Sequence, residues 1–574
     1  MRKSSALFLN DWLNSGVLND EEIKELKNAT ESEIEDRFYQ DLEFGTAGMR
    51  GVIGMGTNRM NIYTVRRAAQ GMSAYVKSVN GEERGVVIGY DTRYFSEEFA
   101  RETARVLVAN GIKAYLFDVV HATPEVSFGI RYYKAAAGVM ITASHNPKEY
   151  NGFKAYGEDG GQFPPEASDL IGNVVNSYDI FKDVKIISDS ELDESPLFNI
   201  IGKEADEAFL EAVLKQSINP DVIREVSDDF KLIYTPLHGT GLRPVTEILK
   251  RTGVKNFTVE PKQAIADPAF PTVKSPNPEN QEAFLDAIEL AKANDASLVI
   301  GTDPDADRVG IVVRDSDGNY QTLTGNQIGA LLCEYVLSAK KKNGTLNNKS
   351  TIIKTIVTSE LIQAIADEYG VILENVLTGF KYIAQKIANY EKTGSNEYVF
   401  GFEESHGYLP GTYARDKDAV GAVMLISEMA ASYKKQGMTL YDGLMDIYKR
   451  YGFYKEKTIS VTMPGKDGME KMKKLTEDIR KNPPTEFGGI KVKVLEDYET
   501  LKAYGENGET ELKGFVSSDV LKFKLSDNKS FVVIRPSGTE PKIKLYLGTA
   551  TDSLKESEEK IAFLEKEVRK AINL

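Results

Sequence analysis

The chain has 574 residues, which at about 150 residues per domain is enough for roughly four domains. Its 71 Lys and Arg residues against 86 Asp and Glu residues give a net charge of −15, and so acidic a surface argues against nucleic acids and anionic membranes as main partners. With 41% hydrophobic and 27% charged residues, the composition is that of a globular protein and not of a disordered chain.

The chain shows no pattern of export or membrane insertion. The apolar run Ala6–Leu9 ends at Asn10 and is too short for the core of a signal peptide. No run approaches the 18 apolar residues or so of a membrane span. The only cysteine, Cys333, cannot form an internal disulfide, which is typical of a reducing compartment. We therefore expect a soluble, cytoplasmic protein in which Cys333 is a buried thiol on a packing helix.

A strand, a helix that stops at a glycine and a second strand follow one another at three places. The pattern covers residues 85–118, 231–259 and 351–373. Glycine accepts the left-handed conformation that ends many helices, and apolar strands that alternate with helices predict parallel βαβ units. Any α/β protein offers similar segments, so the pattern alone leaves open whether the three units are true repeats.

The C-terminal part has a different pattern. Val520–Leu525 and Ser530–Ile534 flank a short polar turn and predict a β-hairpin, and Ile543–Leu547 predicts a further strand. Apolar residues at helical spacing between Ser553 and Ile572 predict a packing helix. The expected fold class is therefore α/β, with three similar domains that have mixed sheets and a C-terminal α+β domain. The expected domains are residues 1–205, 206–322, 323–452 and 453–574.

Three aspartates follow the apolar segment Val299–Ile300, which we expect to be a strand. Asp303, Asp305 and Asp307 alternate along the chain, and in an extended loop residues two apart point the same way. Pro304 disfavours a continuous helix here. Converging carboxylates repel one another unless a cation is present, and Mg²⁺ prefers oxygen ligands. The segment therefore predicts a divalent metal site.

The segment could also be an EF-hand loop or an acidic surface turn. An EF-hand is excluded, because Arg308 and Arg314 stand where that motif needs glycine and glutamate. An acidic surface turn remains the alternative. Arg308 is expected either to bind a phosphate oxygen or to balance the acidic charge.

A second polar segment, Thr142–Pro147, follows the predicted strand Ala137–Ile141. It places Ser144 at the exit of the strand, where ligands bind in open α/β sheets. A simple turn is the alternative. A Ser-His-Asp hydrolase is disfavoured, because Ser144 lacks a Gly-x-Ser-x-Gly motif and the neighbouring His145 is expected to diverge from it. Ser144 could instead carry a phosphoryl group whose oxygen completes the metal site, with Lys154 facing the same anion.

The segment between the last two predicted strands has the composition of an anion-binding loop. Arg535 can grip phosphate oxygens, Ser537 and Thr539 can donate hydroxyl hydrogen bonds, and the amide of Gly538 is unobstructed. The segment contains no candidate catalyst, so we expect it to hold a phosphate passively. A tight hairpin turn is the alternative.

Two further loops carry polar groups suited to a sugar. Residues 400–407 place Glu403 and Ser405 on a glycine-bounded loop, where acceptors and donors could pair with neighbouring hydroxyls. A charged, capped turn is the alternative. Thr378 and Gly379 belong to a shorter loop of similar character.

Taken in this order, four motifs resemble the α-D-phosphohexomutase family, which includes phosphoglucomutase and phosphomannomutase. The motifs are Thr142–Pro147, Asp303–Arg308, Gly401–His406 and Arg535–Thr539, and the opening segment Glu43–Gly51 is similar to the N-terminal signature of the family. Pro304 and Ala306, where many members have glycine, look more like the bacterial phosphoglucomutases and the phosphopentomutase-like branch. So does His406 directly after Ser405.

The resemblance implies a fold, a reaction and residue roles. It implies four domains around a central cleft and a phosphoglucomutase that interconverts glucose 1-phosphate and glucose 6-phosphate. A phosphoserine enzyme, Mg²⁺ and glucose 1,6-bisphosphate, as intermediate and activator, belong to that reaction. The implied roles are Ser144 as the phosphoserine and a metal ligand, Asp303, Asp305 and Asp307 as metal ligands, Glu403 and Ser405 on sugar hydroxyls, Thr378 and Gly379 in a specificity loop, and Arg535, Ser537, Gly538 and Thr539 on the non-reacting phosphate.

The sequence leaves the sugar and the proton transfer open. Phosphomannomutase or phosphopentomutase activity is the first alternative. A phosphatase with Asp303 as nucleophile and Asp305 as acid, or a catalytically silent sugar-phosphate sensor, is more distant. Lys154 and Lys417 are the favoured acid–base groups, and a lysine would need a lowered pKa to act as a base. The remaining candidates are Arg50, His145 and His406. We expect sugar phosphates as partners and a monomer or dimer.

Overall fold

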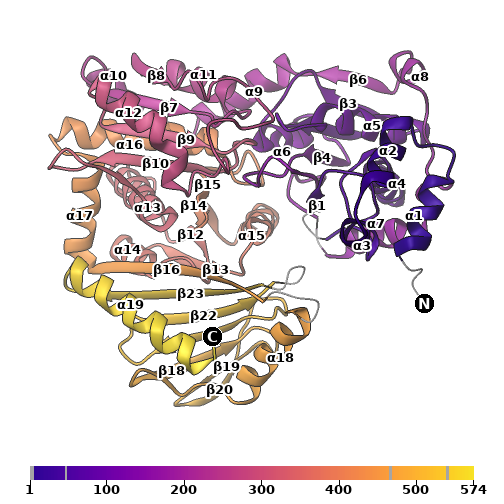
Figure 1. Ribbon diagram of the computed structural model, residues 1–574. Helices are drawn as coiled ribbons and strands as arrows, with labels where there is room; N and C mark the ends of the chain where they lie inside the picture. Colours follow the sequence, from indigo (N-terminus) through magenta and orange to yellow (C-terminus); the bar gives the residue numbers. More distant parts are fainter. Residues whose placement is uncertain (1–4, 46–47, 164, 464–467, 538–541) are drawn as a thin grey trace. The chain divides into compact units, whose positions relative to one another are not determined.

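The computed structural model describes residues 5–45, 48–163, 165–463, 468–537 and 542–574. Two compact units are present, with their elements labelled in Figure 1. Unit 1 comprises residues 1–325 and 380–440, and unit 2 comprises residues 326–379 and 441–574. None of the helices in the described ranges combines the length and the apolar character of a membrane span.

Unit 1 begins with three short helices that pack around one indole ring. Trp12 makes edge-to-face contacts with Phe38, Tyr63 and Phe181 at centroid distances of 5.2–5.7 Å. The second and third helices start with capping boxes, which satisfy backbone N–H groups that a helix leaves unpaired. The helices are α1 (Ser5–Leu13), α2 (Asp20–Asn28) and α3 (Glu31–Phe38).

The first sheet of unit 1 has the strand order β1-β5-β4-β2-β3-β6. β2 lies parallel to β3 and β4, and β6 lies parallel to β3, whereas β5 is antiparallel to β4 and to β1. The strands are β1 (Met49–Val52), β2 (Val86–Tyr90), β3 (Ala114–Phe117), β4 (Ala137–Ile141), β5 (Tyr150–Gly157) and β6 (Phe198–Ile201).

Helices cover both faces of this sheet, because successive strand side chains point to opposite faces and both faces are apolar. Val86 and Ile88 pack with α4, α5 and α7, whereas Val87 packs with α6 on the opposite face. The helices are α4 (Ile62–Ser78), α5 (Ser96–Ala109), α6 (Thr123–Tyr132), α7 (Pro165–Ser177) and α8 (Asp189–Asp193).

The second sheet of unit 1 has the order β11-β10-β9-β7-β8. β7 lies parallel to β8 and β9, and β10 runs antiparallel to β9 and β11. The strands are β7 (Lys231–Thr235), β8 (Asn256–Val259), β9 (Leu298–Thr302), β10 (Val309–Arg314) and β11 (Tyr320–Thr322). The helices are α9 (Lys203–Leu214), α10 (Val222–Glu225), α11 (Leu242–Thr252), the 3₁₀ helix η1 (Gln281–Phe284) and α12 (Leu285–Asn294).

The rest of unit 1 contains a strand pair and a central helix. α16 is buried at every residue from Ala419 to Ala431, which fits its apolar character on all sides. Asp418 caps this helix by accepting the N–H groups of Val420 at 2.7 Å and Gly421 at 3.0 Å. The elements are α15 (Phe380–Thr393), β14 (Glu397–Glu403), its antiparallel partner β15 (Gly407–Leu409) and α16 (Ala419–Lys435).

Unit 2 combines a parallel strand pair with an antiparallel sheet. β12 pairs in parallel with β13. The antiparallel sheet has the order β16-β23-β22-β21-β18-β19-β20, β17 pairs with β18, and α18 and α19 share one core with the sheet. The strands are β12 (Ser350–Thr355), β13 (Ile372–Val376), β16 (Phe453–Thr462), β17 (Glu486–Phe487), β18 (Ile490–Asp497), β19 (Lys502–Gly505), β20 (Gly508–Glu511), β21 (Leu521–Leu525), β22 (Phe531–Pro536) and β23 (Lys542–Thr551). The helices are α13 (Gly325–Lys342), α14 (Leu361–Tyr369), α17 (Leu440–Tyr451), α18 (Gly468–Lys481) and α19 (Leu554–Ala571).

The predicted strand–helix–glycine–strand pattern is confirmed at all three places. β2 and β3, β7 and β8, and β12 and β13 are parallel pairs. The glycines that follow the intervening helices, Gly111, Gly253 and Gly370, have φ angles of 77°, 93° and 66°. The hairpin β21–β22, the helix α19 and the buried thiol of Cys333 are confirmed as well. The boundaries of the four domains stay a prediction.

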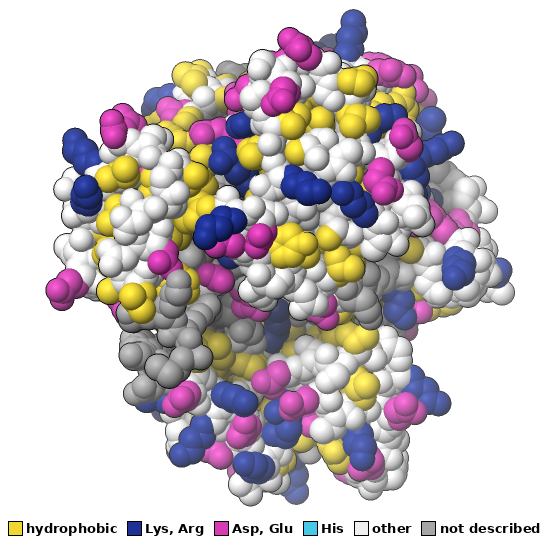
Figure 2. Space-filling model, turned by 90° about the vertical axis from the view of Figure 1, so that its right-hand side faces the viewer, with side chains coloured by type: hydrophobic (Ala, Val, Ile, Leu, Met, Phe, Trp, Pro, Cys, Tyr) yellow, Lys and Arg dark blue, Asp and Glu magenta, His cyan; other side chains and the backbone are white. Residues whose placement is uncertain are grey.

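Charges of both signs are mixed on one face of the molecule. On the face in Figure 2, Lys and Arg side chains are interspersed with Asp and Glu side chains. The net charge of −15 is therefore not gathered into one acidic area on this face.

Glu456 on β16 is a carboxyl group with an unfavourable environment. Its Oε1 atom is shielded from water and has no hydrogen-bond partner among the described residues. Burial raises the pKa of Glu456 to about 7, against a hydrogen bond from Ser359 that lowers it. A raised pKa means that the folded state keeps a proton which the unfolded state releases at lower pH. Stability linked to this group is therefore present below its ordinary pKa and is lost as the pH rises through about 7.

We predict that Glu456→Gln raises the free energy of unfolding at about pH 8 by on the order of 1–2 kcal/mol and leaves it nearly unchanged at about pH 5. The amide stays neutral where the carboxylate must be ionised. Urea denaturation at both pH values measures the difference. Glu558→Gln, at a side chain that is 52% exposed and paired with Lys455, is the control and should show no such pH dependence. Equal effects of Glu456→Gln at both pH values would contradict the prediction.

Candidate active site

Ser144 lies directly after β4 and is held in an uncommon conformation. Its φ angle is 52°, in the left-handed region, and the residue is 3% exposed. Its backbone N–H donates to Thr142 Oγ1 at 2.8 Å, and its hydroxyl donates to Asp303 Oδ2 at 2.7 Å. A left-handed non-glycine residue costs on the order of 1–3 kcal/mol, so its surroundings must hold it in place.

Arg93 and Asp91, which the sequence analysis missed, hold the Ser144 loop. The Arg93 guanidinium donates to the carbonyls of Ser144 and Asn146, and also to those of Pro147 at 2.9 Å and Tyr150 at 3.1 Å. Asp91 pairs with Arg93 at 3.2 Å and accepts the Thr142 hydroxyl at 2.6 Å. Both charged side chains are fully buried. Both residues follow a buried strand, and ligands bind at the exits of strands in open α/β sheets. The argument that identified Ser144 could therefore have identified them as well.

The aspartate segment between β9 and β10 forms a turn, so the expectation of an extended loop was wrong. Ala306 has a φ angle of 49°, and its N–H donates to the carbonyl of Asp303 at 2.9 Å. Asp303 Oδ1 accepts the N–H groups of Asp307 at 3.1 Å and Arg308 at 3.0 Å, which curls the segment around this carboxylate. The three carboxylates still converge, because each offers an oxygen within 4.8 Å of the others.

Neighbouring loops fix the position of this turn. Thr123, at the start of α6, donates its hydroxyl to Asp305 Oδ2 at 2.7 Å and its N–H to the carbonyl of Asp305 at 2.8 Å. Thr240 donates its N–H to the carbonyl of Pro304 at 2.8 Å. A Cβ atom at Gly239 would lie 2.4 Å from the Cα atom of Pro304, so the close approach of these loops requires glycine there.

Two lysines balance the charge of the carboxylates. Lys154 on β5 donates to Asp305 Oδ2 at 2.6 Å and to Asp307 Oδ2 at 2.8 Å. Lys417 lies 3.3 Å from Asp307 and 3.0 Å from Asp416. Burial raises the pKa of Asp307, but Lys154, Lys417 and Arg308 outweigh it and hold that pKa below the usual range. No lysine in the described part of the chain pairs with Asp303, and its burial together with the neighbouring carboxylates raises its pKa.

The same contacts affect the lysines as candidate bases. Burial by itself would lower the pKa of Lys154, but Asp305 and Asp307 raise it above the ordinary value. The pKa of Lys417 is raised in the same way, mainly by Asp307 and Asp416. The lowered pKa that a lysine base requires is thus absent from this structure, and both lysines are cationic here.

His145 contacts Ser144 and Arg50 contacts Asn146 in the same loop, whereas His406 contacts β10. His145 Nδ1 is 3.1 Å from Ser144 Oγ, so the expectation that the two side chains diverge was wrong. Burial, followed by the charges of Arg308 and Arg50, lowers the pKa of His145 well below its usual value. Arg50 donates to Asn146 Oδ1 at 3.2 Å. The buried His406 faces the carbonyl of Val309 at 3.3 Å.

Arg308 and Glu403 complete this part of unit 1. Arg308 pairs with Glu279 and lies 3.9 Å from Asp307. Glu403 ends β14, is 6% exposed, and its charge acts on both Arg308 and Lys417. Ser405 follows it and is half-buried. Glu403 therefore belongs to the same group of charges as the aspartates.

The aspartate group fits a divalent cation. Asp305 Oδ1 and Asp307 Oδ1 are shielded from water and have no hydrogen-bond partner among the described residues. Such buried oxygens are costly unless something pairs with them, and carboxylate oxygens are the ligands of hard cations. A second group, His121, Glu125 and Asp206, also lies within metal-binding range, but there the guanidinium of Arg243 contacts all three.

Family models match four consecutive parts of the chain. They describe phosphoglucomutase/phosphomannomutase α/β/α domains I, II and III, over residues 41–180, 207–318 and 324–451, and the C-terminal domain of the same family, over residues 467–563. The chain belongs to this family. It is thus a member of the α-D-phosphohexomutases, as its motifs predicted, and an isomerase that moves a phosphoryl group within a sugar phosphate.

Relatives of known name agree with this assignment. A phosphoglucomutase from Staphylococcus haemolyticus is 39% identical over 524 residues, which are 91% of this chain and 93% of the relative. A phosphoglucomutase from Staphylococcus epidermidis is 39% identical over 550 residues, 95% of this chain and 97% of the relative. The solved open form of parafusin, a phosphoglucomutase from Paramecium, shares the fold, with a TM-score of 0.68 and 17% identity over 93% of this chain and 96% of the other.

The remaining candidate residues of this phosphohexomutase lie in unit 2. Gly379 has a φ angle of 125°, and the hydroxyl of Thr378 is shielded from water with no hydrogen-bond partner among the described residues. Arg535 is at the end of β22, and Ser537 donates its N–H to the carbonyl of Lys542 at 2.8 Å. Gly538 and Thr539 lie outside the described residues. Their predicted roles stay predictions.

We predict that Arg93→Met lowers the free energy of unfolding by about 3–5 kcal/mol, because it leaves Asp91 as a buried, unpaired charge and removes the donor for four carbonyls. Urea denaturation of the metal-free mutase measures this effect. Arg84→Met is the matched control, since Arg84 pairs with Glu158 at a surface where the two side chains are 40% and 64% exposed. The control should cost less than about 1 kcal/mol, and equal losses in the two variants would contradict the role given to Arg93.

Proposed function

We propose that the protein interconverts glucose 1-phosphate and glucose 6-phosphate through a phosphorylated Ser144 and a glucose 1,6-bisphosphate intermediate. The observation that supports this most directly is the Ser144 hydroxyl, 2.7 Å from Asp303 within a group of three carboxylates and two lysines. Such a hydroxyl is placed to carry a phosphoryl group beside a cation. The name phosphoglucomutase of both Staphylococcus relatives supports glucose as the sugar.

The residues for the metal follow from the same group. We assign Asp303, Asp305 and Asp307, with Ser144 in its phosphorylated form, as the groups that would hold Mg²⁺. Bound there, Mg²⁺ would supply electrostatic stabilisation for the charge on the transferring phosphoryl group. Lys154 and Lys417 supply further positive charge from the protein itself, and Arg308 can pair with a phosphate oxygen.

The chemical step moves one phosphoryl group in each direction. The bond between phosphorus and Ser144 Oγ breaks as the 6-hydroxyl of glucose 1-phosphate forms a new bond to phosphorus. That hydroxyl loses its proton, and Ser144 Oγ is protonated on release. In the second half, the bond between phosphorus and the C1 oxygen of glucose 1,6-bisphosphate breaks as Ser144 Oγ forms a new bond to that phosphorus. Ser144 Oγ loses its proton, the C1 oxygen gains one, and glucose 6-phosphate is left. The acid–base candidates stay Lys154, Lys417, His145, Arg50 and His406.

The intermediate must present first one end and then the other to Ser144. The distant phosphate therefore needs a second binding site that takes no part in the reaction. We assign this site to Arg535, Ser537, Gly538 and Thr539. Glu403, Ser405, Thr378 and Gly379 are assigned to the sugar hydroxyls. This second binding site would keep the bisphosphate bound while it turns. Exclusion of water would keep the phosphoserine from hydrolysis in the part of the cycle in which Ser144 carries the phosphoryl group.

We predict that Ser144→Ala abolishes mutase turnover, because the variant has no acceptor for the phosphoryl group. A coupled assay for glucose 6-phosphate measures turnover, and intact-mass analysis measures the phosphoryl group on the protein before and after incubation with glucose 1,6-bisphosphate. Ser190→Ala, at an exposed serine of α8, is the control and should keep both. Turnover near the wild-type level in Ser144→Ala would overturn the proposed function.

The sugar preference has its own test. We predict the highest kcat/KM for glucose 1-phosphate when glucose 1-phosphate, mannose 1-phosphate and ribose 1-phosphate are compared in one assay. A site whose polar groups pair with sugar hydroxyls rejects a sugar that leaves them unpaired. A higher kcat/KM for mannose 1-phosphate or ribose 1-phosphate would contradict the assignment to glucose while leaving the phosphoserine mechanism intact.

A further inference from the structure

A cavity of about 440 Å³ lies in unit 1 at the opposite end of β9 from the aspartate turn. Leu298, which begins β9, lines the cavity, whereas Asp303 follows the end of that strand. At about 3.3 Å per strand residue, the two ends are roughly 16 Å apart. The cavity is therefore separate from the Ser144 site, and neither the proposed reaction nor its candidate residues involve it.

Three cations reach this cavity from three elements. Lys231 begins β7, Arg314 ends β10 and Lys434 lies in the last turn of α16. Two carboxylates, Asp229 and Asp295, line the same space. Cations thus outnumber carboxylates, in a protein whose overall charge is −15.

The charges of all three cations act on Asp295, but only Arg314 forms an ion pair with it. The hydrogen bond from Arg314 lowers the pKa of Asp295 most, and the charges of Lys231 and Lys434 lower it further. Lys231 donates to the carbonyl of Asn294 at 3.2 Å. No carboxylate among the described residues forms an ion pair with Lys434, whose neighbour Lys435 pairs with Glu225. A further anion near Lys434 would balance this excess of positive charge.

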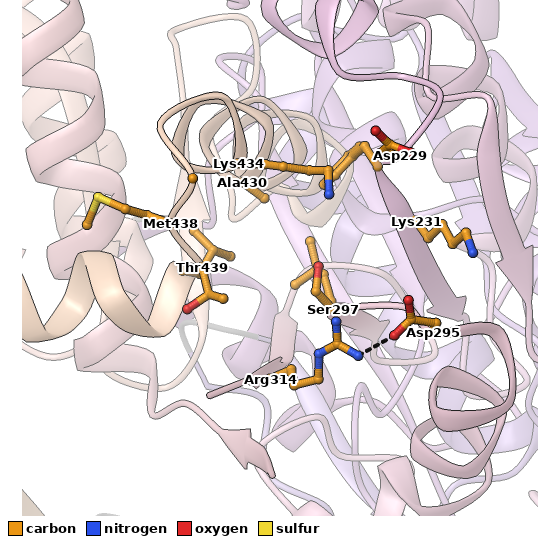
Figure 3. Close-up of a pocket in the computed structure, with 13 residues that line it drawn as sticks. Asp229, Lys231, Asp295, Ser297, Arg314, Ala430, Lys434, Met438 and Thr439 are labelled. Atoms are coloured by element: carbon orange, nitrogen blue, oxygen red, sulfur yellow. Dashed lines mark hydrogen bonds and ion pairs between the residues drawn. The ribbon is translucent and has the colours of Figure 1, made fainter. Parts of the chain in front are cut away.

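The side chains that could hold such an anion converge. In Figure 3 the ammonium group of Lys434 and the side chain of Ser297 point toward the guanidinium of Arg314, whereas Lys231 turns away from them. An ammonium, a hydroxyl and a guanidinium are the donors that bind phosphate oxygens. Arg314 has further N–H donors for an anion, because its contact with Asp295 uses one of its two terminal nitrogens.

The rest of the lining is suited to the body of a small organic molecule. Phe230, Leu298, Ala430, Met438 and Leu440 line the cavity beside the cations. Pockets for small ligands are typically about 300–1,000 Å³, mostly apolar, with a few convergent polar groups. The volume falls in this range, and the lining of this cavity is shared about equally between polar and apolar surface.

We propose that this cavity binds a small phosphorylated metabolite, with its phosphate between Lys434, Ser297 and Arg314. The site is independent of the phosphoryl transfer at Ser144. It does not require the proposed function to be correct.

Hydrogen exchange measured by mass spectrometry tests the proposal on the full-length protein. The probes are inorganic phosphate and AMP, which share a phosphate group, and citrate, which carries only carboxylates. We expect phosphate and AMP to slow exchange in peptides covering residues 226–232 and 430–440. Peptides covering residues 140–154 report binding at the Ser144 site separately, so the two sites are distinguished in one experiment.

Lys434→Met removes the charge and keeps the length of the side chain. We expect it to weaken AMP binding at residues 430–440 about tenfold, which corresponds to about 1.4 kcal/mol. Lys435→Met, one residue further along the same helix end but outside the cavity lining, is the matched control and should bind as the wild type does. Ser297→Ala is a second variant and should weaken binding as well, without removing a charge.

Three results would overturn the proposal. One is the absence of protection at residues 226–232 and 430–440 with both phosphate and AMP. Another is equal protection in Lys434→Met and the wild type. The third is protection by citrate that equals or exceeds that by the phosphate probes, which would make the site one for carboxylates.

Discussion

Three buried carboxylates within five residues can coexist only beside positive charge. Removing a single ionised carboxylate from water costs several kcal/mol unless it is paired and hydrogen-bonded. In this protein the pairing comes from far along the chain, because Lys154 belongs to β5 and Lys417 precedes α16. The aspartate turn thus ties together segments that are more than a hundred residues apart, and the candidate site forms only when the chain between them has folded.

The negative charge of the aspartates is only partly balanced by the neighbouring cations. Among the described residues, Asp305 and Asp307 each keep one buried oxygen without a hydrogen-bond partner, and no lysine pairs with Asp303. A protein that only needed a stable turn would gain by replacing such groups with apolar ones. The divalent cation and the phosphorylated Ser144 that we propose would use these oxygens. The raised pKa values of the lysines follow from the same excess of carboxylate.

Much of the fold could be predicted from the sequence, because its signals are local. Glycine after a helix, apolar strands and a polar hairpin turn mark elements that the structure confirms. The three aspartates converge as predicted, but not for the predicted reason. We expected an extended loop with alternating side chains, whereas the segment turns at Ala306.

The contacts of Arg93 with the Ser144 loop could not be identified from the sequence, because they are with backbone carbonyls, which carry no sequence signal. The contact between Ser144 and His145 depends on a left-handed φ angle that serine rarely adopts, so residue order alone indicates divergence. Pairing of Lys154 with Asp305 spans 151 residues. Motif position could suggest that Lys154 belongs to the site, but it could not show that the carboxylates raise its pKa.

The most direct measurement of the central claim is a titration with Mn²⁺, followed by electron paramagnetic resonance of the free ion. Mn²⁺ accepts the same oxygen ligands as Mg²⁺ and is observable. The account predicts one tight site per chain that is lost in Asp305→Asn and kept in Asp315→Asn, at an aspartate in the turn between β10 and β11. Binding of Mn²⁺ to Asp305→Asn with the affinity of the wild type would contradict it.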